Sequence, residues 1–347
     1  MSDAVFLPGL GQLDPCDGWV FLEKCSDDLH MSNVNGVCSI AATGDGKVEL
    51  IGFENKTLAY VKSELGYPAY YPLSPASLTL PVKAVLMDLD GTTVRSEEFW
   101  IWIIEQSIAA LLGDKSFRLE EEDIPYVSGH SVSEHLVYCI KKYALTDADD
   151  NSGSTKQALS DALIKARTYY TELTEREMEL ILAGKGRANA FTPTAGVKDF
   201  LLELKKLDVK IALVTSGLYR KAYPEIISAF DTLKMGDPAE FYDCIITGGF
   251  PLGEGSAGTL GELEAKPHPW LYAEACSVGL GVHVENRSQV IGIEDSAAGV
   301  CAVRLAGYYT IGLSGGNIIE SGARGMCDRY CESFDEVLQI IKGGANE

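Results

Sequence analysis

From residue 82 onward, short apolar runs alternate with segments of helical spacing. The run VKAVLMDLD (82–90) is continuously apolar and ends in acidic residues, as a buried strand with functional groups at its carboxyl end would. Four later runs have the same character: VKIALVTSG (209–217), YDCIITGG (242–249), QVIGIEDS (289–296) and YYTIGLSGG (308–316). Segments with helical spacing follow or separate them at 197–207, 218–230, 269–277, 297–307 and 333–343. This alternation predicts an α/β fold, with a Rossmann-like three-layer core around a parallel sheet.

A long insertion separates the first two of these strands. It has helical patterns at 97–113, 131–145 and 154–184. We expect a helical cap domain over residues 96–190, inserted into a catalytic core formed by residues 81–95 and 191–347.

The first 80 residues have a different pattern. Short strands are predicted at 19–25, 36–43 and 47–53, with a turn at residues 44–46. A helix is predicted over NKTLAYVKSELG (55–66), followed by an extended, Pro-rich connector. We therefore expect residues 1–80 to form a small α+β appendage, and a homodimer formed through it is one possible role.

Composition narrows the range of functions. The 347 residues include 50 acidic and 29 basic ones, which gives a formal charge of −21. Nucleic acid and anionic membranes attract clustered Lys and Arg, so neither partner is expected. The N-terminus lacks the basic start and apolar run of a secretory signal, and no apolar run is long enough to cross a bilayer. The nine scattered cysteines contain no CxxC pair, which favours free thiols and a cytoplasmic location.

The first group of candidate residues lies in DLDGTT (88–93), where a strand passes into a loop. Two acids separated by one residue can flank the same ligand, and Gly91 lets the backbone bend sharply after them. Gly91 and Thr92 are candidates for binding substrate phosphate. Asp88 can attack phosphorus if the negative charges are partly neutralised, and Mg²⁺ with oxygen ligands is suited to that task. Asp90 can protonate the leaving alcohol and then deprotonate the attacking water.

Three more segments offer phosphate or metal contacts. Thr215, Ser216 and Gly217 follow a strand, and a hydroxyl with exposed N–H groups can hold phosphate oxygens, although an ordinary helix cap has the same composition. Lys266 lies between alanine and proline and can neutralise phosphate. Asp295 suits a Mg²⁺ ligand, while Glu294 could bind the ion through water or orient its ligands. In a parallel sheet these strand ends face one crevice.

These four segments, in this order and with an inserted helical cap, resemble the haloacid dehalogenase superfamily. The similar branch contains β-phosphoglucomutases and sugar-phosphate phosphatases, and the resemblance covers about residues 82–343. It implies that Asp88 is the nucleophile and a metal ligand, and that Asp90 is the acid/base, with its backbone carbonyl on the metal. It further implies phosphate binding by Thr215 and Ser216, charge stabilisation by Lys266, and metal binding by Asp295 with support from Glu294.

The resemblance favours a Mg²⁺-dependent phosphatase acting on a small phosphorylated metabolite such as a sugar phosphate. The metal-free dehalogenases lack the second acid of the first motif, which is Asp90 in this chain. Phosphonoacetaldehyde hydrolases have Ala at that position and need a cap lysine that residues 94–105 do not offer. A mutase stays open, but Trp100 replaces the His of similar mutases, and the segment at Gly129–Val132 lacks their Arg. A catalytically silent binding protein is the remaining alternative.

Within the cap, we expect residues 127–136 to face the substrate. His130 is the candidate there, since imidazole can donate a hydrogen bond to a hydroxyl or to a second anionic group. The Gly-rich stretch 248–265 is a candidate flap over the site or a tolerated surface loop.

Overall fold

The computed structural model describes residues 4–62, 68–124, 132–145, 153–187, 190–248 and 264–343. Its centre is a six-stranded sheet in the order β12-β11-β8-β13-β14-β15, with every neighbouring pair parallel. The strands are β8 (Ala84–Asp88), β11 (Lys210–Val214), β12 (Cys244–Ile246), β13 (Val290–Glu294), β14 (Tyr309–Leu313) and β15 (Arg329–Cys331). The strand order reverses between β8 and β13, where open α/β sheets bind their ligands. The five predicted strands are confirmed, whereas β15 was not predicted.

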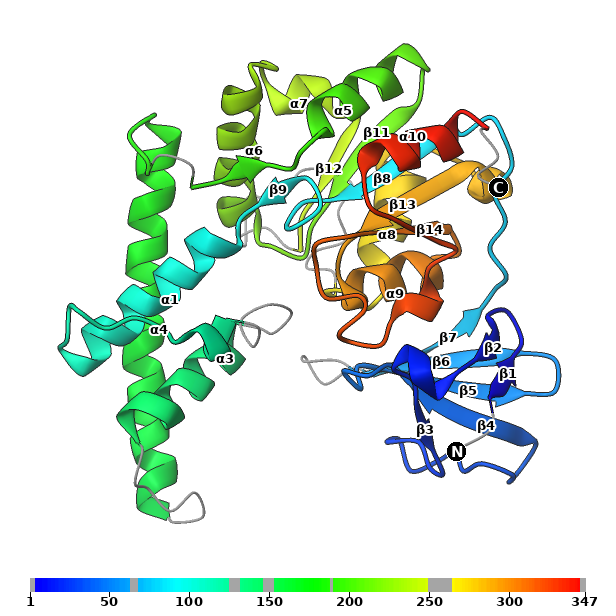
Figure 1. Cartoon of the computed structure of the whole chain (residues 1–347), viewed down its shortest axis with the longest axis horizontal. Helices are drawn as coiled ribbons and strands as arrows, with labels where there is room; N and C mark the ends of the chain where they lie inside the picture. Colours follow the sequence, from blue (N-terminus) through cyan, green and yellow to red (C-terminus); the bar gives the residue numbers. More distant parts are fainter. Residues whose placement is uncertain are drawn as a thin grey trace.

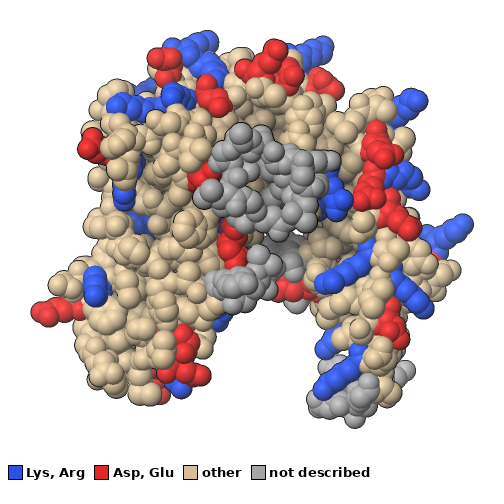
Figure 2. Space-filling model, turned by 180° about the vertical axis from the view of Figure 1, so that it is seen from behind, with Lys and Arg blue, Asp and Glu red and all other residues tan. Residues whose placement is uncertain are grey.

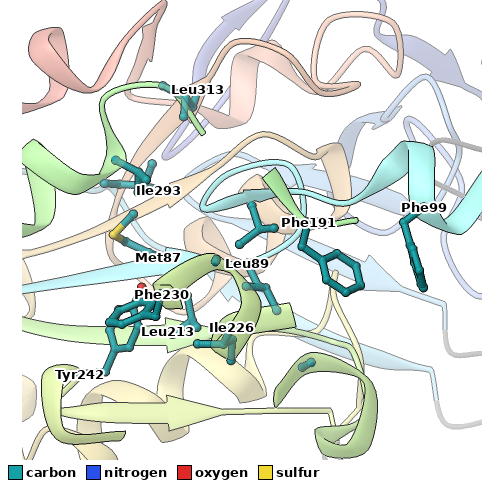
Figure 3. Packing of buried hydrophobic residues seen from close by; sticks show 14 of the residues in the cluster. Met87, Leu89, Phe99, Phe191, Leu213, Ile226, Phe230, Tyr242, Ile293 and Leu313 are labelled. Atoms are coloured by element: carbon teal, nitrogen blue, oxygen red, sulfur yellow. The ribbon is translucent and has the colours of Figure 1, made fainter. Parts of the chain in front are cut away.

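Helices cover both faces of this sheet (Figure 1). They are α5 (Val197–Lys206), α6 (Tyr219–Leu233), α7 (Pro238–Phe241), α8 (Trp270–Glu274), α9 (Ala297–Leu305) and α10 (Phe334–Ile341). Alternation along the strands divides the core, because Val85 and Met87 pack with α5, α6 and α10 while Ala84 and Leu86 pack with α8 and α9. Figure 3 shows part of the first cluster, with side chains from β8, β11 and β13 beside α6. The predicted three-layer core is confirmed.

The inserted segment is helical. It contains α1 (Glu97–Leu112), a 3₁₀ turn (Glu121–Asp123), α3 (Val132–Cys139), a π-helical turn (Ile140–Ala144) and α4 (Gly153–Leu182). The short strands β9 (Val94–Arg95) and β10 (Thr192–Pro193) pair antiparallel where the chain leaves and re-enters the core. Packing of Phe99 against Phe191, with ring centroids 4.7 Å apart, closes this junction (Figure 3).

The N-terminal region is built from strands. A five-stranded antiparallel sheet has the order β3-β4-β5-β6-β7, and β1 pairs with β2 beside it. Their bounds are β1 (Val5–Leu7), β2 (Gly11–Leu13), β3 (Val20–Leu22), β4 (Val37–Ala42), β5 (Val48–Phe53), β6 (Thr57–Val61) and β7 (Ala69–Leu73), with a 3₁₀ turn at Pro15–Asp17. The sheet and the cap helices extend from the core as two arms (Figures 1 and 2), and basic and acidic side chains are interspersed on the described surface in Figure 2.

The predicted helix over residues 55–66 is wrong in its described part, because residues 57–61 form strand β6. This strand pairs with β5 on one side and β7 on the other, so its backbone groups are satisfied by the sheet. Thr57, Tyr60 and Val61 are β-branched or aromatic and fit a pleated, buried surface better than a helix. The rest of the predicted helix from residue 63 onward lies outside the described residues.

The N-terminal sheet packs on α9 as a fourth layer. One buried cluster unites Leu50 and Val61 of the sheet with Val300 and Cys301 of α9. Arg304, on the same helix, is almost fully buried and donates to the Gly9 carbonyl and to the Asp328 carboxylate, each at 2.7 Å. One face of the sheet is therefore used within the chain, and the described residues offer no support for the predicted homodimer through it.

None of the helices in the described part of the chain combines the length and apolar character needed to cross a membrane. The longest, α4, has alternating polar and apolar residues along its length.

Because the N-terminal sheet and the core share one apolar cluster, they should unfold together. Leu50→Ala removes a fully buried side chain from that cluster and should cost about 2–5 kcal/mol of unfolding free energy. Urea unfolding followed by tryptophan fluorescence and circular dichroism should show one shifted transition. Leu29→Ala, at a position 75% exposed, is the control and should change the midpoint little. Two separate transitions, with only the first one shifted, would contradict a shared core.

Candidate active site

Three neighbouring strands bring the predicted site residues to one edge of the sheet. In the parallel register, Asp88 of β8 lies beside Val214 of β11, and Met87 lies beside Ile293 of β13. The residues that follow, from Leu89, Thr215 and Glu294, therefore leave the sheet side by side. The predicted convergence of these strand ends is thus observed in the structure.

Asp88 and Lys266 form a buried ion pair at this edge. The ammonium of Lys266 contacts Asp88 Oδ1, lies 2.6 Å from Glu294 Oε1 and donates to the Val214 carbonyl at 3.1 Å. The Lys266 and Asp88 side chains are each 7% exposed. A single cation thus bridges the ends of all three strands.

Glu294 is completely buried and already has several partners. Its Oε1 also accepts a hydrogen bond from the Tyr272 hydroxyl, and Oε2 accepts one from Ser296 Oγ at 3.1 Å. Ser296 caps α9 at the same time, since its Oγ accepts from the Gly299 N–H at 3.0 Å. The sequence left two roles open for Glu294, binding the ion through water or orienting its ligands. These contacts favour the orienting role.

Asp295 is held against the loop that follows β8. The Thr92 hydroxyl donates to Asp295 Oδ1 at 3.0 Å. Gly91 has φ +84°, and a Cβ there would lie 2.0 Å from Asp295 Oδ2. Only glycine meets both demands, the positive φ and the close approach of the carboxylate.

The residues present fit a divalent cation. Asp88, Glu294 and Asp295 are all buried and offer carboxylate oxygens that lie within 4.8 Å of one another. Burial raises the pKa of Asp88 well above its ordinary value, the charge of Glu294 adds to the rise, and Lys266 opposes it. Burial, together with Glu294, likewise raises the pKa of Asp295 to about 7. This excess of buried negative charge is what a bound Mg²⁺ would relieve.

Lys266 is the counter-charge in this group. Burial alone would lower the pKa of its ammonium, but the charges of Asp88 and Glu294 outweigh burial and raise it. The lysine therefore stays protonated at neutral pH, as charge stabilisation requires.

A second acidic group, in the cap, is paired with a lysine. Glu120, Glu122 and Asp123 lie close together, and the ammonium of Lys142 contacts all three carboxylates at 2.7 Å. The Tyr138 hydroxyl also donates to Asp123 at 2.7 Å. This cluster is satisfied by protein groups.

Asp90 differs from Asp88 in its surroundings. It is exposed, its Oδ1 accepts from Ser96 Oγ at 2.7 Å, and its Oδ2 lies 3.4 Å from Thr215 Oγ1. Its side chain is not part of the buried carboxylate group and is accessible to solvent. Metal binding through its backbone carbonyl stays a prediction.

The segment after β11 is arranged around its hydroxyl groups. Thr215 is buried, and its Oγ1 accepts from the Gly217 N–H at 2.9 Å. Ser216 is exposed, and its Oγ accepts from the Lys266 N–H at 3.1 Å. Neither residue caps α6, whose N-cap is Leu218. Phosphate binding by Thr215, Ser216 and Gly217 stays a prediction, and Ser216 is the hydroxyl exposed to solvent.

Two sequence-based candidates lie outside the described residues. His130 falls in the stretch 125–131, and only residues 248, 264 and 265 of the predicted flap are described.

Sequence reasoning missed several residues around the site. Glu225, on α6, is 2% exposed; burial raises its pKa well above the ordinary value, and the charge of Asp90 adds to the rise. Lys221, one turn earlier, lies 3.8 Å from the centre of the Trp100 ring and donates to the Tyr170 hydroxyl at 3.0 Å. These residues join core and cap beside Asp90. In the sequence, Glu225 is a single Glu after Pro224 in a helical segment, and this pattern does not indicate a position beside the site.

The family model described as haloacid dehalogenase-like hydrolase matches residues 82–307, nearly two thirds of the chain. The chain belongs to this family. The match begins after the N-terminal sheet, which lies outside the matched residues. Among curated proteins, no sequence matches the chain significantly.

Several solved structures are similar to this chain. A predicted phosphoglycolate phosphatase from Haemophilus somnus 129PT is 19% identical, with a TM-score of 0.52 over 76% of this chain and 99% of its own. A HAD family hydrolase from Deinococcus radiodurans R1, with bound phosphate and sodium, has 22% identity and a TM-score of 0.48, covering 77% and 97%. CbbY from Rhodobacter sphaeroides in complex with phosphate has 20% identity and a TM-score of 0.47, covering 74% and 96%. Of these three, the phosphatase from Haemophilus somnus has a TM-score above 0.5, and at 19% identity it supports the fold of this chain alone.

The acidic cluster predicts a pH-dependent response to Mg²⁺. Because the folded pKa of Asp295 is raised, the folded state without Mg²⁺ binds protons more tightly than the unfolded state does. The carboxylate cluster therefore destabilises the fold increasingly as pH rises from about 4 to about 7. Mg²⁺ at about 100 times its Kd should add about 2.7 kcal/mol to the free energy of unfolding. The resulting rise in Tm should be larger at about pH 8, where the carboxylates are ionised, than at about pH 5.5.

Thermal unfolding with and without Mg²⁺ measures this effect. Asp295→Asn should remove most of the rise in Tm, whereas Asp335→Asn, at an exposed position on α10, should retain it. An equal rise at both pH values, or an unchanged rise in Asp295→Asn, would contradict metal binding at this cluster.

Proposed function

We propose that the chain is a phosphatase that hydrolyses a small phosphorylated metabolite, with Mg²⁺ as cofactor and a phosphorylated Asp88 as intermediate. The observation that supports it best is the meeting of Asp88, Lys266 and Asp295 at the reversal of strand order, with Asp90 two residues beyond the nucleophile. Membership of the hydrolase family supports the same reaction class.

In the first step, an oxygen of Asp88 attacks phosphorus, and the bond from phosphorus to the substrate's oxygen breaks. Asp90 gives its proton to that leaving oxygen, so the alcohol departs neutral. The Ser96 and Thr215 hydroxyls hold the Asp90 carboxyl during this transfer. Lys266, already in contact with Asp88, remains beside the negative charge that the phosphoryl group brings.

In the second step, Asp90 takes a proton from water, and the water oxygen attacks phosphorus. The bond between Asp88 and phosphorus breaks, which restores the carboxylate and releases inorganic phosphate. One residue therefore acts first as acid and then as base, which requires a side chain exposed to the crevice. Asp90 is exposed, whereas Asp88 is buried.

Asp88 and Asp295 would hold Mg²⁺, with Glu294 orienting Lys266 and the cap of α9. When bound, Mg²⁺ supplies positive charge that offsets the phosphate and the nucleophile. The donor set consists of carboxylates, the hard oxygen ligands that Mg²⁺ prefers.

The substrate class follows from the family resemblance, which favours a sugar phosphate or a related metabolite. A cytoplasmic location is part of the same proposal. A mutase would pass the phosphoryl group to a second sugar hydroxyl, and no described contact favours this reaction. Equal amounts of dephosphorylated product and inorganic phosphate would identify hydrolysis.

Replacing the nucleophile should abolish turnover. Asp88→Asn keeps the shape of the side chain but weakens it as a nucleophile, so we expect at least about a 10³-fold loss of kcat with the fold intact. Phosphate release from an aryl phosphate, with circular dichroism as the check on folding, measures it. Asp208→Asn, an exposed residue whose φ of +58° suits Asn, should keep full activity. Unchanged phosphate release in Asp88→Asn would refute the assigned nucleophile.

The acid role of Asp90 can be separated from binding by the choice of leaving group. An alkyl alcohol needs a proton to depart, whereas p-nitrophenolate does not. Asp90→Asn should therefore lose roughly 10²–10⁴-fold in kcat on an alkyl phosphate and clearly less on p-nitrophenyl phosphate when the first step limits the rate. Equal losses on both substrates would argue against proton donation by Asp90.

A further inference from the structure

The N-terminal sheet reaches the loop that bears Lys266. Strand β7 contains Tyr70 and Tyr71, and because successive side chains of a strand point to opposite faces, the two rings face different surroundings. Tyr70 is exposed and contacts the rings of His30 and Tyr60 within the N-terminal region. Tyr71 points the other way, toward the core.

Tyr71 makes a specific contact with that loop. Its hydroxyl lies 2.7 Å from Nδ1 of His268, a residue that is only 2% exposed. The two rings meet edge to face at 5.7 Å, and the Trp270 ring lies 6.4 Å from Tyr71 in a similar arrangement. Because His268 is buried, water cannot replace this hydrogen bond at low cost, and the bond therefore holds both side chains in place.

The loop has little backbone support of its own. In Lys266–Pro267–His268–Pro269, the two prolines have no N–H to donate. The remaining two N–H groups donate to Ser216 Oγ at 3.1 Å and to the Ala265 carbonyl at 3.1 Å. The second of these bonds lies within the loop. The described contacts that tie the loop to other elements are the bond to Ser216, the first helical bond of α8, from the Ala273 N–H to the Pro269 carbonyl at 3.0 Å, and the side-chain contacts of His268 and Lys266.

We infer that Tyr71 is a positioning residue for Lys266, acting through His268, so that the N-terminal sheet completes the active site. This inference rests on the proposed function and deepens it. Lys266 must keep its ammonium against Asp88 while charge develops at the reacting phosphate, and a displacement of about 1 Å in such a group can reduce turnover up to roughly 10²-fold. Tyr71 has no contact with Asp88 or Asp295 among the described interactions, which makes its effect indirect.

The same packing explains why the sheet can serve as a fixed support. It shares a buried cluster with α9, and α9 begins directly after Asp295 and Ser296. The N-terminal sheet therefore packs against the site at two places. It contacts α9, which follows the end of β13, and through Tyr71 it contacts the loop that bears Lys266.

The test compares Tyr71→Phe with the matched control Tyr70→Phe in the full chain. Tyr71→Phe removes only the hydroxyl, and we expect kcat to fall roughly tenfold with KM changed less than about twofold, since substrate contacts remain. Tyr70→Phe should leave kcat unchanged. His268→Asn, whose amide can replace Nδ1, should keep more activity than His268→Ala.

A double variant decides whether the two side chains act together. If they act through their mutual hydrogen bond, Tyr71→Phe combined with His268→Ala should lose no more activity than His268→Ala alone. Losses that multiply would overturn the inference, as would an unchanged kcat in Tyr71→Phe.

Hydrogen exchange gives a readout that does not depend on activity. Amides in a peptide covering residues 264–272 should exchange faster in Tyr71→Phe than in the wild type, while Tyr70→Phe should match the wild type. Unchanged exchange in Tyr71→Phe would overturn the inference even if the enzyme is a phosphatase. Faster exchange in a protein that releases no phosphate would support the contact and refute the proposed function instead.

Discussion

The constraint on which the rest of the structure depends is the burial of three carboxylates against one ammonium at the edge of the central sheet. Asp88, Glu294 and Asp295 lie close to one another, and the ammonium of Lys266 is in direct contact with two of them, Asp88 and Glu294. Such a group is costly without further positive charge. The surrounding framework, from the positive φ of Gly91 to the cap of α9 by Ser296, holds these charges together.

The different roles proposed for the two acids of the first motif agree with their different environments. Asp88 ends a strand that is buried along its whole length, whereas the Asp90 side chain is exposed to solvent. Two groups of the same chemistry thus differ in solvation, one suited to attack and the other to proton exchange. Glu225 lies beside Asp90, and burial raises its pKa well above the ordinary value, which favours its uncharged form.

The core could be predicted from sequence because its signals are local. Continuous apolar runs ending in DLD, VTS and IED indicated buried strands, and the parallel-sheet geometry implied that their ends converge. The helix expected over residues 55–66 failed because TLAYV is equally compatible with either period, and only pairing with β5 and β7 decides the outcome. The contact between Tyr71 and His268 joins residues 197 positions apart, and no local pattern reveals it.

One signal was present in the sequence and went unused. The segment AAGVCAVRL is apolar around its whole circumference, and such a helix must be covered on all sides. In the structure, the central sheet packs on one side of α9 and the N-terminal sheet on the other. The one charged residue of this segment, Arg304, is buried and donates hydrogen bonds to the Asp328 carboxylate and the Gly9 carbonyl.

The most direct test of the central claim is anomalous diffraction from crystals grown with Mn²⁺ in place of Mg²⁺. The account predicts one strong peak between the carboxylates of Asp88 and Asp295. The absence of a peak there, or a peak only at the cap cluster of Glu120, Glu122 and Asp123, would contradict it.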